Sequence, residues 1–226
     1  KALGYNKMWP GPALRVTEGD QVRINVTNNL DETTGVHMHG IEFDNWYMDG
    51  IPFLTQPPII PGETFTYTFV VDQVGTYWYH PHPHGRTGPQ VYRGLAGLFI
   101  VSDDEEQSIG LPSDEYDLPL VIQDRTFDRD NQLIYNIGHR MEQMTGFLGD
   151  WILVNGNPDF ILPVATRAYR LRILNGSNSR IYKLAWQDGS PLTVIGTDCG
   201  LLETPVLRGY VMMGPGERIE LWVDFS

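Results

Sequence analysis

Cysteine is nearly absent from this chain of 226 residues. Cys199 is the single cysteine, so an intrachain disulfide and a four-thiolate zinc or iron–sulfur site are both excluded. Without disulfides, cysteine usage does not indicate the cellular compartment. We expect Cys199 itself to be a small buried side chain in a strand–loop segment.

Long apolar runs and positive charge are also scarce. The longest apolar run, residues 94–101, is shorter than the ~18 residues of a membrane-spanning helix, and it predicts a buried strand. Sixteen Lys and Arg residues stand against 28 Asp and Glu residues, so the formal net charge is −12. This charge disfavours nucleic acid and anionic membranes as partners and suits a cationic ligand or metal better.

Helical periodicity is missing as well, whereas strand signals are dense. Residues 21–27 and 64–71 alternate apolar and polar side chains, and residues 76–80 form a short aromatic run. Glycine, proline, Asn and Asp recur about every eight to twelve residues, a rhythm typical of sandwiches and barrels. We therefore predict an all-β chain.

One acidic segment, residues 102–117, interrupts the strand pattern and has few large apolar side chains. Such a composition is typical of a linker. The sequence therefore predicts a first domain at residues 1–102, a linker at 103–116 and a second domain at 117–226.

The second half of the chain echoes the first. Residues 23–28 (RINVTN) are similar to residues 170–175 (RLRILN). A Pro-Gly-Glu triplet precedes a strand pattern at residues 61–63 and again at residues 215–217. This weak internal duplication predicts two copies of one β-sandwich.

Five of the six histidines fall in two short clusters, residues 37–40 (HMHG) and 78–85 (WYHPHPHG). Residues i and i+2 of a strand point to the same face, so a His-x-His pair directs two imidazoles to one side of a sheet. Neutral imidazole suits copper, zinc, iron and nickel. The clusters therefore predict a metal site built on two pairs: His37 with His39, and His80 with His82.

The second copy lacks this chemistry. Leu184 and Trp186 stand at the positions that His37 and His39 occupy in the first copy. The remaining histidine, His139, lies in an irregular stretch, and we expect it to be a surface or loop residue.

The residue pattern alone leaves the metal open. A His-x-His pair with a third histidine can form a catalytic zinc site with an open position, and four histidines can hold two ions. The combination of His37, His39 and Glu42 is similar to cupin metal motifs, although Glu42 comes early for that pattern. Redox-active copper is equally compatible with neutral imidazoles.

Several segments resemble the multicopper oxidases, with the bacterial laccase-like and copper-efflux oxidases as the nearest members. The resemblance covers almost the whole chain and implies two tandem cupredoxin-like Greek-key β-sandwich or barrel domains. The segments that carry it are residues 10–20, 37–40, 60–63, 75–82 and 94–101 in the first half, and 171–176 and 214–218 in the second.

The resemblance also implies roles for the histidines. His37 matches a ligand of the type 2 copper, and His39, His80 and His82 match ligands of the type 3 copper pair. His84 matches a family position that does not bind copper directly. These assignments follow from the family motif, residue by residue, rather than from spacing.

Asp49 resembles the acidic residue that lies near the trinuclear copper site in this family. In that role it orients water and passes protons toward bound dioxygen. Aspartate before glycine is also an ordinary turn signal, and the sequence favours neither interpretation.

The chain departs from the family in one respect. Multicopper oxidases normally have a third cupredoxin domain, which carries the type 1 copper and the other four histidines of the trinuclear site. Those motifs are absent here, since Cys199 is not followed by a histidine. The resemblance therefore implies a partner: a C-terminal cupredoxin domain, cleaved from the same gene product or present as a separate chain.

The implied reaction couples one-electron oxidation of a phenol, aromatic amine or metal ion to the four-electron reduction of dioxygen to water. Such oxidases are usually exported, which implies a periplasmic or extracellular location. Two other functions stay open: a copper-free cupredoxin scaffold for binding or assembly, and a cupin-like zinc or iron enzyme.

Overall fold

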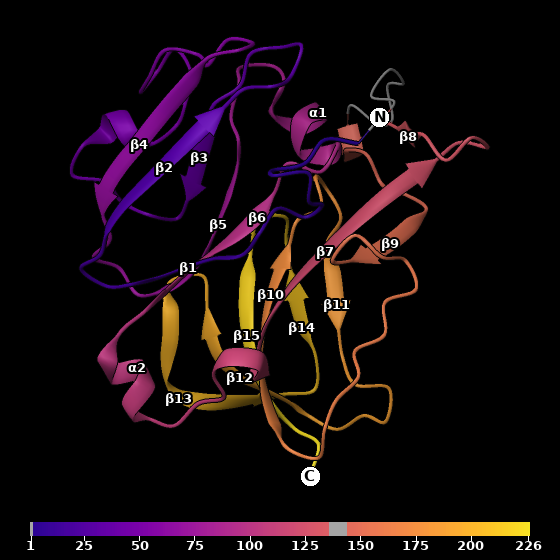
Figure 1. Ribbon diagram of the computed structural model, residues 1–226. Coiled ribbons are helices and arrows are strands. Elements are labelled where there is room, and N and C mark those ends of the chain that lie inside the picture. The colour runs from indigo at the N-terminus through magenta and orange to yellow at the C-terminus, as the bar shows by residue number, and fades with distance from the viewer. Residues whose placement is uncertain (1, 136–143) are drawn as a thin grey trace. The chain divides into compact units, whose positions relative to one another are not determined.

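The computed structural model describes residues 2–135 and 144–226, which divide into two compact units. The first unit is Leu3–Asp103 and the second is Asp104–Ser226. Both consist mainly of strands (Figure 1), so the all-β prediction is confirmed.

The first unit contains two sheets. Four strands form one sheet in the order β1-β6-β5-β3, in which β1 and β6 are parallel and the other neighbours are antiparallel. The antiparallel pair of β2 and β4 forms the other sheet (Figure 1). The elements in chain order are β1 (Leu14–Thr17), β2 (Gln21–Thr27), β3 (Val36–His39), η1 (Trp46–Met48), β4 (Thr64–Val70), β5 (Gly75–Pro81), α1 (Thr87–Tyr92) and β6 (Gly97–Ser102).

The two sheets of the first unit share one hydrophobic core. Alternate residues of β2, namely Val22, Ile24 and Val26, point into the same cluster as Tyr77 and Tyr79 of β5. Side chains on a strand alternate between its two faces. Trp78, between the two tyrosines, and His80, after them, therefore face away from this core. That second face of β5 is the face on which the histidines of this strand lie.

Tyr79 holds β5 in place from the core side. Its hydroxyl donates a hydrogen bond to the carbonyl oxygen of Pro12 at 2.7 Å. Gly97 lies opposite Tyr79 on β6, and a Cβ at that position would come within 2.3 Å of the tyrosine ring. The missing side chain of Gly97 therefore lets the tyrosine lie flat across the neighbouring strand.

The second unit is built on a larger sheet in the order β13-β12-β15-β10-β7-β8, with β9 also paired to β7. Strands β11 and β14 form a separate antiparallel pair. The elements are α2 (Asp104–Ser108), η2 (Asp114–Tyr116), β7 (Asp117–Phe127), β8 (Leu133–Ile134), β9 (Trp151–Val154), β10 (Ala168–Asn175), β11 (Tyr182–Leu184), β12 (Leu192–Thr197), β13 (Gly200–Arg208), β14 (Val211–Met213) and β15 (Arg218–Asp224).

A buried network of ion pairs distinguishes the second unit. Arg172 contacts Asp117 and Glu106 at 2.8 Å each and Glu220 at 3.1 Å, and Arg170 also pairs with Glu106 and Glu220. All five side chains are buried. Because Glu106 belongs to α2, this helix is attached to the second unit by charged hydrogen bonds, which are stronger than neutral ones.

The helices are short and were not predicted. Helices α1 and α2 have six and five residues, too few for an apolar 3.6-residue period to emerge from the sequence. Helix α2 and η2 lie within the segment 103–116 that the sequence predicts as a linker. No helix in the described part of the chain has the length and apolar character that a membrane crossing requires.

Candidate metal centre

The pairing of β3 with β5 brings the two histidine clusters together. In this antiparallel pair His37 lies opposite His80, and His39 lies opposite Trp78. Met38 and Tyr79, which alternate with these residues, point into the hydrophobic core. The histidines therefore share the face of the sheet that is turned away from the core.

Three of these imidazoles converge. The ring centroid of His37 lies 5.5 Å from that of His39 and 5.3 Å from that of His80. Nδ1 of His39 is 3.2 Å from Nε2 of His80. One ring nitrogen from each of the three residues lies within 4.8 Å of the other two, a grouping that could hold a metal ion.

His82 lies beside this group, just after the end of β5. Its backbone N–H donates to the carbonyl oxygen of Gly35 at 3.3 Å. Its ring centroid is 5.5 Å from that of His37 and 5.9 Å from that of His80. The fourth imidazole is thus a neighbour of the three-histidine group without belonging to it.

Asp49 contacts His37 directly. Nδ1 of His37 is 2.8 Å from the backbone oxygen of Asp49 and 3.1 Å from its carboxylate Oδ1. The close approach requires Gly50, which has a φ of 81° and where a Cβ would lie 1.9 Å from the carbonyl oxygen of Val36. The sequence pair Asp49-Gly50 therefore places a carboxylate against a histidine and is more than an isolated turn.

The hydrogen bonds of these histidines favour one tautomer. A proton on Nδ1 of His37 is accepted by the Asp49 carbonyl oxygen, and a proton on Nδ1 of His80 is accepted by that of Pro81 at 2.9 Å. Nε2 is then the unprotonated nitrogen of both rings, the atom that can bind a metal. In the metal-free chain, Nε2 of His80 can accept a hydrogen bond from Nδ1 of His39, 3.2 Å away. Fixing one ring nitrogen so that the other can ligate is the usual arrangement around metal-bound histidine.

Burial keeps His80 neutral. It lowers the pKa of His80 to about 3, although the hydrogen bond to Pro81 acts in the opposite direction, and the neighbouring histidines lower it further. An imidazole must be deprotonated to bind a metal, so this environment leaves His80 available as a ligand at neutral pH.

Residues 1–106 match the family model described as multicopper oxidase. The "Multicopper oxidase mco" of Staphylococcus aureus is 39% identical over 225 residues, which are 99% of this chain and 48% of that protein. The "Cell division protein FtsP" of Escherichia coli (strain K12) is 36% identical over 231 residues, 99% of this chain and 46% of that protein. A crystal structure of a laccase from Pediococcus acidilactici is 39% identical, with a TM-score of 0.90 over 98% of this chain and 47% of that chain.

The chain is thus similar to multicopper oxidases over nearly its whole length, and its first 106 residues match the model of that family. Its strands and sheets match those of the multicopper oxidase structures, which confirms the prediction of cupredoxin-like β-sandwich domains. The chain spans about half the length of the curated relatives it matches.

Copper, the metal that the multicopper oxidase family implies, fits the donor set of this chain. The converging ligand atoms are imidazole nitrogens, which suit copper. In His37 and His80, Nδ1 is held by a backbone carbonyl oxygen, and Nε2 lies on the other side of the ring. The single thiol, Cys199, belongs to the second unit. It therefore adds no sulfur ligand to the histidine group of the first unit.

Two sequence predictions about other residues have different outcomes. The prediction that Cys199 is buried was wrong, because Asp198 and Cys199 form a two-residue hairpin loop between the paired residues Thr197 and Gly200, and the thiol is exposed. His84 is exposed on the loop after β5. His139 lies outside the described residues.

Trp78 is a residue of this site that was not predicted from the sequence. This indole lies on the same face as the histidines. It stacks on His39 at a ring-centroid distance of 5.1 Å and lies tilted against His80 at 4.2 Å. The signal was present in the sequence, since Trp78 precedes His80 by two residues and therefore shares its face.

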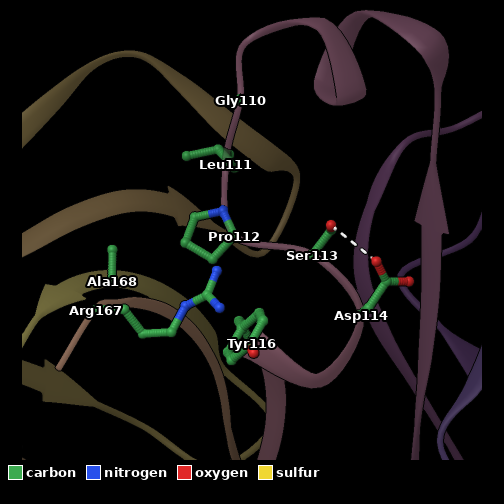
Figure 2. Close-up of a pocket in the computed structure, with 8 residues that line it drawn as sticks. All are labelled: Gly110, Leu111, Pro112, Ser113, Asp114, Tyr116, Arg167 and Ala168. Carbon is green, nitrogen blue, oxygen red and sulfur yellow. Dashed lines mark hydrogen bonds between the residues drawn. The ribbon is translucent and has the colours of Figure 1, made fainter. Parts of the chain in front are cut away.

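A pocket in the second unit has a different chemistry. It is lined by residues 110–114, Tyr116 and residues 167–168, and Figure 2 shows the guanidinium of Arg167 next to Tyr116. Arg167 lies 3.2 Å from the centroid of the Tyr116 ring, a cation–π contact. None of these lining residues is a histidine or cysteine, so the pocket is not a second metal centre of the type found in the first unit.

Proposed function

We propose that this chain supplies half of the ligands of a trinuclear copper centre in a multicopper oxidase. In this proposal His37 binds the type 2 copper, and His39, His80 and His82 bind the type 3 copper pair. The convergence of His37, His39 and His80 on one face of a rigid sheet is the observation that carries the proposal. Ligands on paired strands need little rearrangement when the metal binds.

Bound copper would supply the redox chemistry: four electrons, released one at a time by oxidation of a phenol, aromatic amine or metal ion, would reduce one dioxygen to two waters with the uptake of four protons. The chain's own residues would bind the copper ions and orient the ligand rings. Asp49 holds Nδ1 of His37 and keeps its ring fixed, and its carboxylate at 3.1 Å is placed to accept or pass on a proton.

The proposed centre is completed by a C-terminal cupredoxin domain that also carries the type 1 copper. This domain belongs to the same gene product, cleaved or intact, or to a separate chain. Four histidines of the first unit are half of the set that a trinuclear site uses in the family. A periplasmic or extracellular location is part of the same proposal.

The loop that follows His39 offers a surface for this further domain. Trp46, Phe53 and Leu54 are 63%, 78% and 68% exposed, although all three are large apolar side chains. Phe53 has a φ of 66°, a strained conformation for an aromatic residue, and a hydrogen bond of 2.8 Å from its N–H to the Gln56 carbonyl oxygen holds it there.

A turn that displays apolar side chains in a strained conformation, next to an incomplete metal site, suits a docking surface. We expect Phe53 and Leu54 to lose reactivity toward hydroxyl radicals in the assembly with the proposed C-terminal cupredoxin domain, compared with residues 1–226 alone. Equal labelling of both residues in the two proteins would remove this surface from the proposal.

Copper titration of the purified chain with a competing chelator tests the ligand assignment. His37→Ala, His39→Ala and His80→Ala should each weaken copper binding by at least about tenfold. His84→Ala is the matched control, because His84 lies next to the same cluster but is exposed, and its affinity should equal that of the wild type. The assignment is contradicted if the three ligand variants bind copper as tightly as His84→Ala and the wild type.

Metal content and oxygen uptake of the full-length protein separate this proposal from its two rivals. A copper-free scaffold, a role consistent with the cell-division name of the FtsP relative, would take up no copper after full reconstitution. A cupin-like enzyme would retain zinc or iron instead. Copper uptake together with oxygen consumption that His80→Ala abolishes is the expected result.

A further inference from the structure

Trp78 occupies a position in the row of candidate ligands without being a ligand itself. It lies directly opposite His39 in the β3–β5 pair and two residues before His80 on the same strand. All three side chains consequently lie on one face of the sheet. Trp78 is buried, with 6% of its surface exposed.

The indole contacts both imidazoles at stacking distance. The ring planes of Trp78 and His39 are inclined by 29° with centroids 5.1 Å apart, and those of Trp78 and His80 by 34° with centroids 4.2 Å apart. Aromatic rings at these separations attract one another and resist rotation past one another. Each imidazole is therefore limited on one side by the indole.

The hydrophobic core does not account for this placement. The core of the first unit includes the neighbours Tyr77 and Tyr79, but among its described members Trp78 does not occur. The indole Nε1 is buried and has no hydrogen-bond partner among the described residues. A purely apolar side chain would bury no unpaired N–H, so packing alone does not explain a tryptophan here.

We propose that Trp78 is a positioning residue that holds the His39 and His80 rings in the orientation needed for a shared metal centre. The relation to copper rests on the proposed function, whereas the orientation of the two rings belongs to the metal-free chain. His39 and His80 come from different strands, and the indole stacks on the His39 ring and lies tilted against the His80 ring. It therefore couples the two imidazoles across the strand pair.

The test compares Trp78→Phe, which keeps an aromatic ring and removes Nε1, with Trp78→Leu, which removes the ring. Trp46→Leu is the matched control, since Trp46 is an exposed tryptophan of the same unit. Trp78→Met replaces Trp78→Leu if the leucine variant does not fold, as judged by its far-UV circular dichroism. Thermal unfolding of each variant separates loss of stability from loss of ring orientation.

The first readout is the proton NMR spectrum of the histidine side chains in the metal-free chain. Stacking on the indole should shift the ring protons of His39 and His80 upfield. Trp78→Leu should abolish these shifts, and Trp46→Leu should leave them intact. Unchanged shifts in Trp78→Leu would overturn the inference, whether or not the chain binds copper.

The second readout is copper affinity by chelator competition. Trp78→Leu should bind copper at least about tenfold more weakly than the wild type, in the range expected for loss of a residue that orients a ligand. Trp78→Phe should restore most of this affinity, a rescue that a role in stability alone does not predict. Equal affinity of wild type and Trp78→Leu also overturns the inference. A wild type that binds no more copper than His80→Ala contradicts the proposed function, while the NMR readout still decides the role of Trp78 in ring orientation.

Discussion

The two units contain the same corner, built from the same residues. In the first unit the N–H of Asn28 donates to the carbonyl oxygen of Glu63 at 2.9 Å. In the second, the N–H of Asn175 donates to that of Glu217 at 3.0 Å. The structural equivalence of these two pairs agrees with the internal duplication predicted from the sequence.

The side chains of the two asparagines match as well. Nδ2 of Asn28 donates to the carbonyl oxygen of Ile59 at 2.8 Å, and Nδ2 of Asn175 donates to that of Met213 at 2.9 Å. Ile59 and Met213 each precede the glutamate of their own copy by four residues. One asparagine in each unit thus ties the end of a strand to the segment that precedes its partner strand.

The strands that lead to these corners differ in what covers them. Arg23 in β2 and Arg170 in β10 occupy equivalent positions, yet Arg23 is exposed and Arg170 is buried. Strand β10 has β7 as a parallel neighbour and Glu106 of α2 as an ion partner, whereas β2 pairs with β4 in a two-stranded sheet. The equivalent arginine position therefore faces solvent in the first unit and belongs to a buried charge network in the second.

The largest expected effect contrasts these two arginines. Arg170→Met removes one of the two arginines that pair with buried Glu220, which accepts from Nε of Arg170 at 2.8 Å, and should destabilise the protein by about 3–5 kcal/mol. Arg23→Met should change stability by less than about 0.5 kcal/mol, because Arg23 is exposed. Urea unfolding followed by circular dichroism measures both. A similar cost for the two variants would contradict the distinction between the strands.

The next effect should be equal in the two units. Asn28→Ala and Asn175→Ala each leave two backbone carbonyl groups and one amide without their side-chain partner. Each loss should cost about 2–3 kcal/mol, as expected for partly buried polar groups deprived of their hydrogen bonds. If one variant lost about 2–3 kcal/mol of stability and the other lost almost none, the two corners would not be equivalent.

A smaller effect depends on pH and belongs to the first unit. Burial lowers the pKa of His80 from 6.5 to about 3 in the folded protein. As the pH falls below about 6.5, the unfolded chain takes up a proton that folded His80 refuses, so stability is lost until about pH 3. For the metal-free chain this loss is about 2 kcal/mol between pH 7 and pH 5.

Unfolding of the metal-free chain and of His80→Gln at pH 7, 6 and 5 measures this contribution. The difference between the two proteins should change with pH in the direction just described. Parallel pH profiles would show that His80 is protonated in the folded state as readily as in the unfolded state.

The smallest effect concerns a surface ion pair of the first unit. Nη2 of Arg86 lies 2.7 Å from a carboxylate oxygen of Glu32, but the arginine side chain is 48% exposed. Arg86→Ala should cost less than about 1 kcal/mol, because solvent screens such pairs. If Arg86→Ala lost as much stability as Arg170→Met, burial would not be what distinguishes the two ion pairs.

The local alternation of apolar and polar residues was sufficient to predict two strands of the first unit, β2 and β4. Residues 21–27 form β2 over the predicted range, and residues 64–71 form β4 with one residue fewer at the end. Alternation in these segments reports a sheet with one face toward the core, a property of neighbouring residues. The short helices carry no such period, and nothing in their composition separated them from loops.

The candidate site was predictable in part. The His-x-His spacing placed two imidazoles on one face of each strand, but the pairing of β3 with β5 depends on contacts between distant segments. That pairing determines that Trp78, rather than another residue, lies opposite His39. The exposure of Cys199 likewise depends on where a hairpin turns, which a preference of cysteine for burial does not reveal.

The approach of Gly50 to β3 has a consequence for how this protein can vary. Its α-carbon lies so near the strand that even one methyl group would meet a carbonyl oxygen of Val36. Any replacement would push the Asp49 carbonyl away from the imidazole it steadies. In a saturation library selected for copper retention, position 50 should admit a single amino acid.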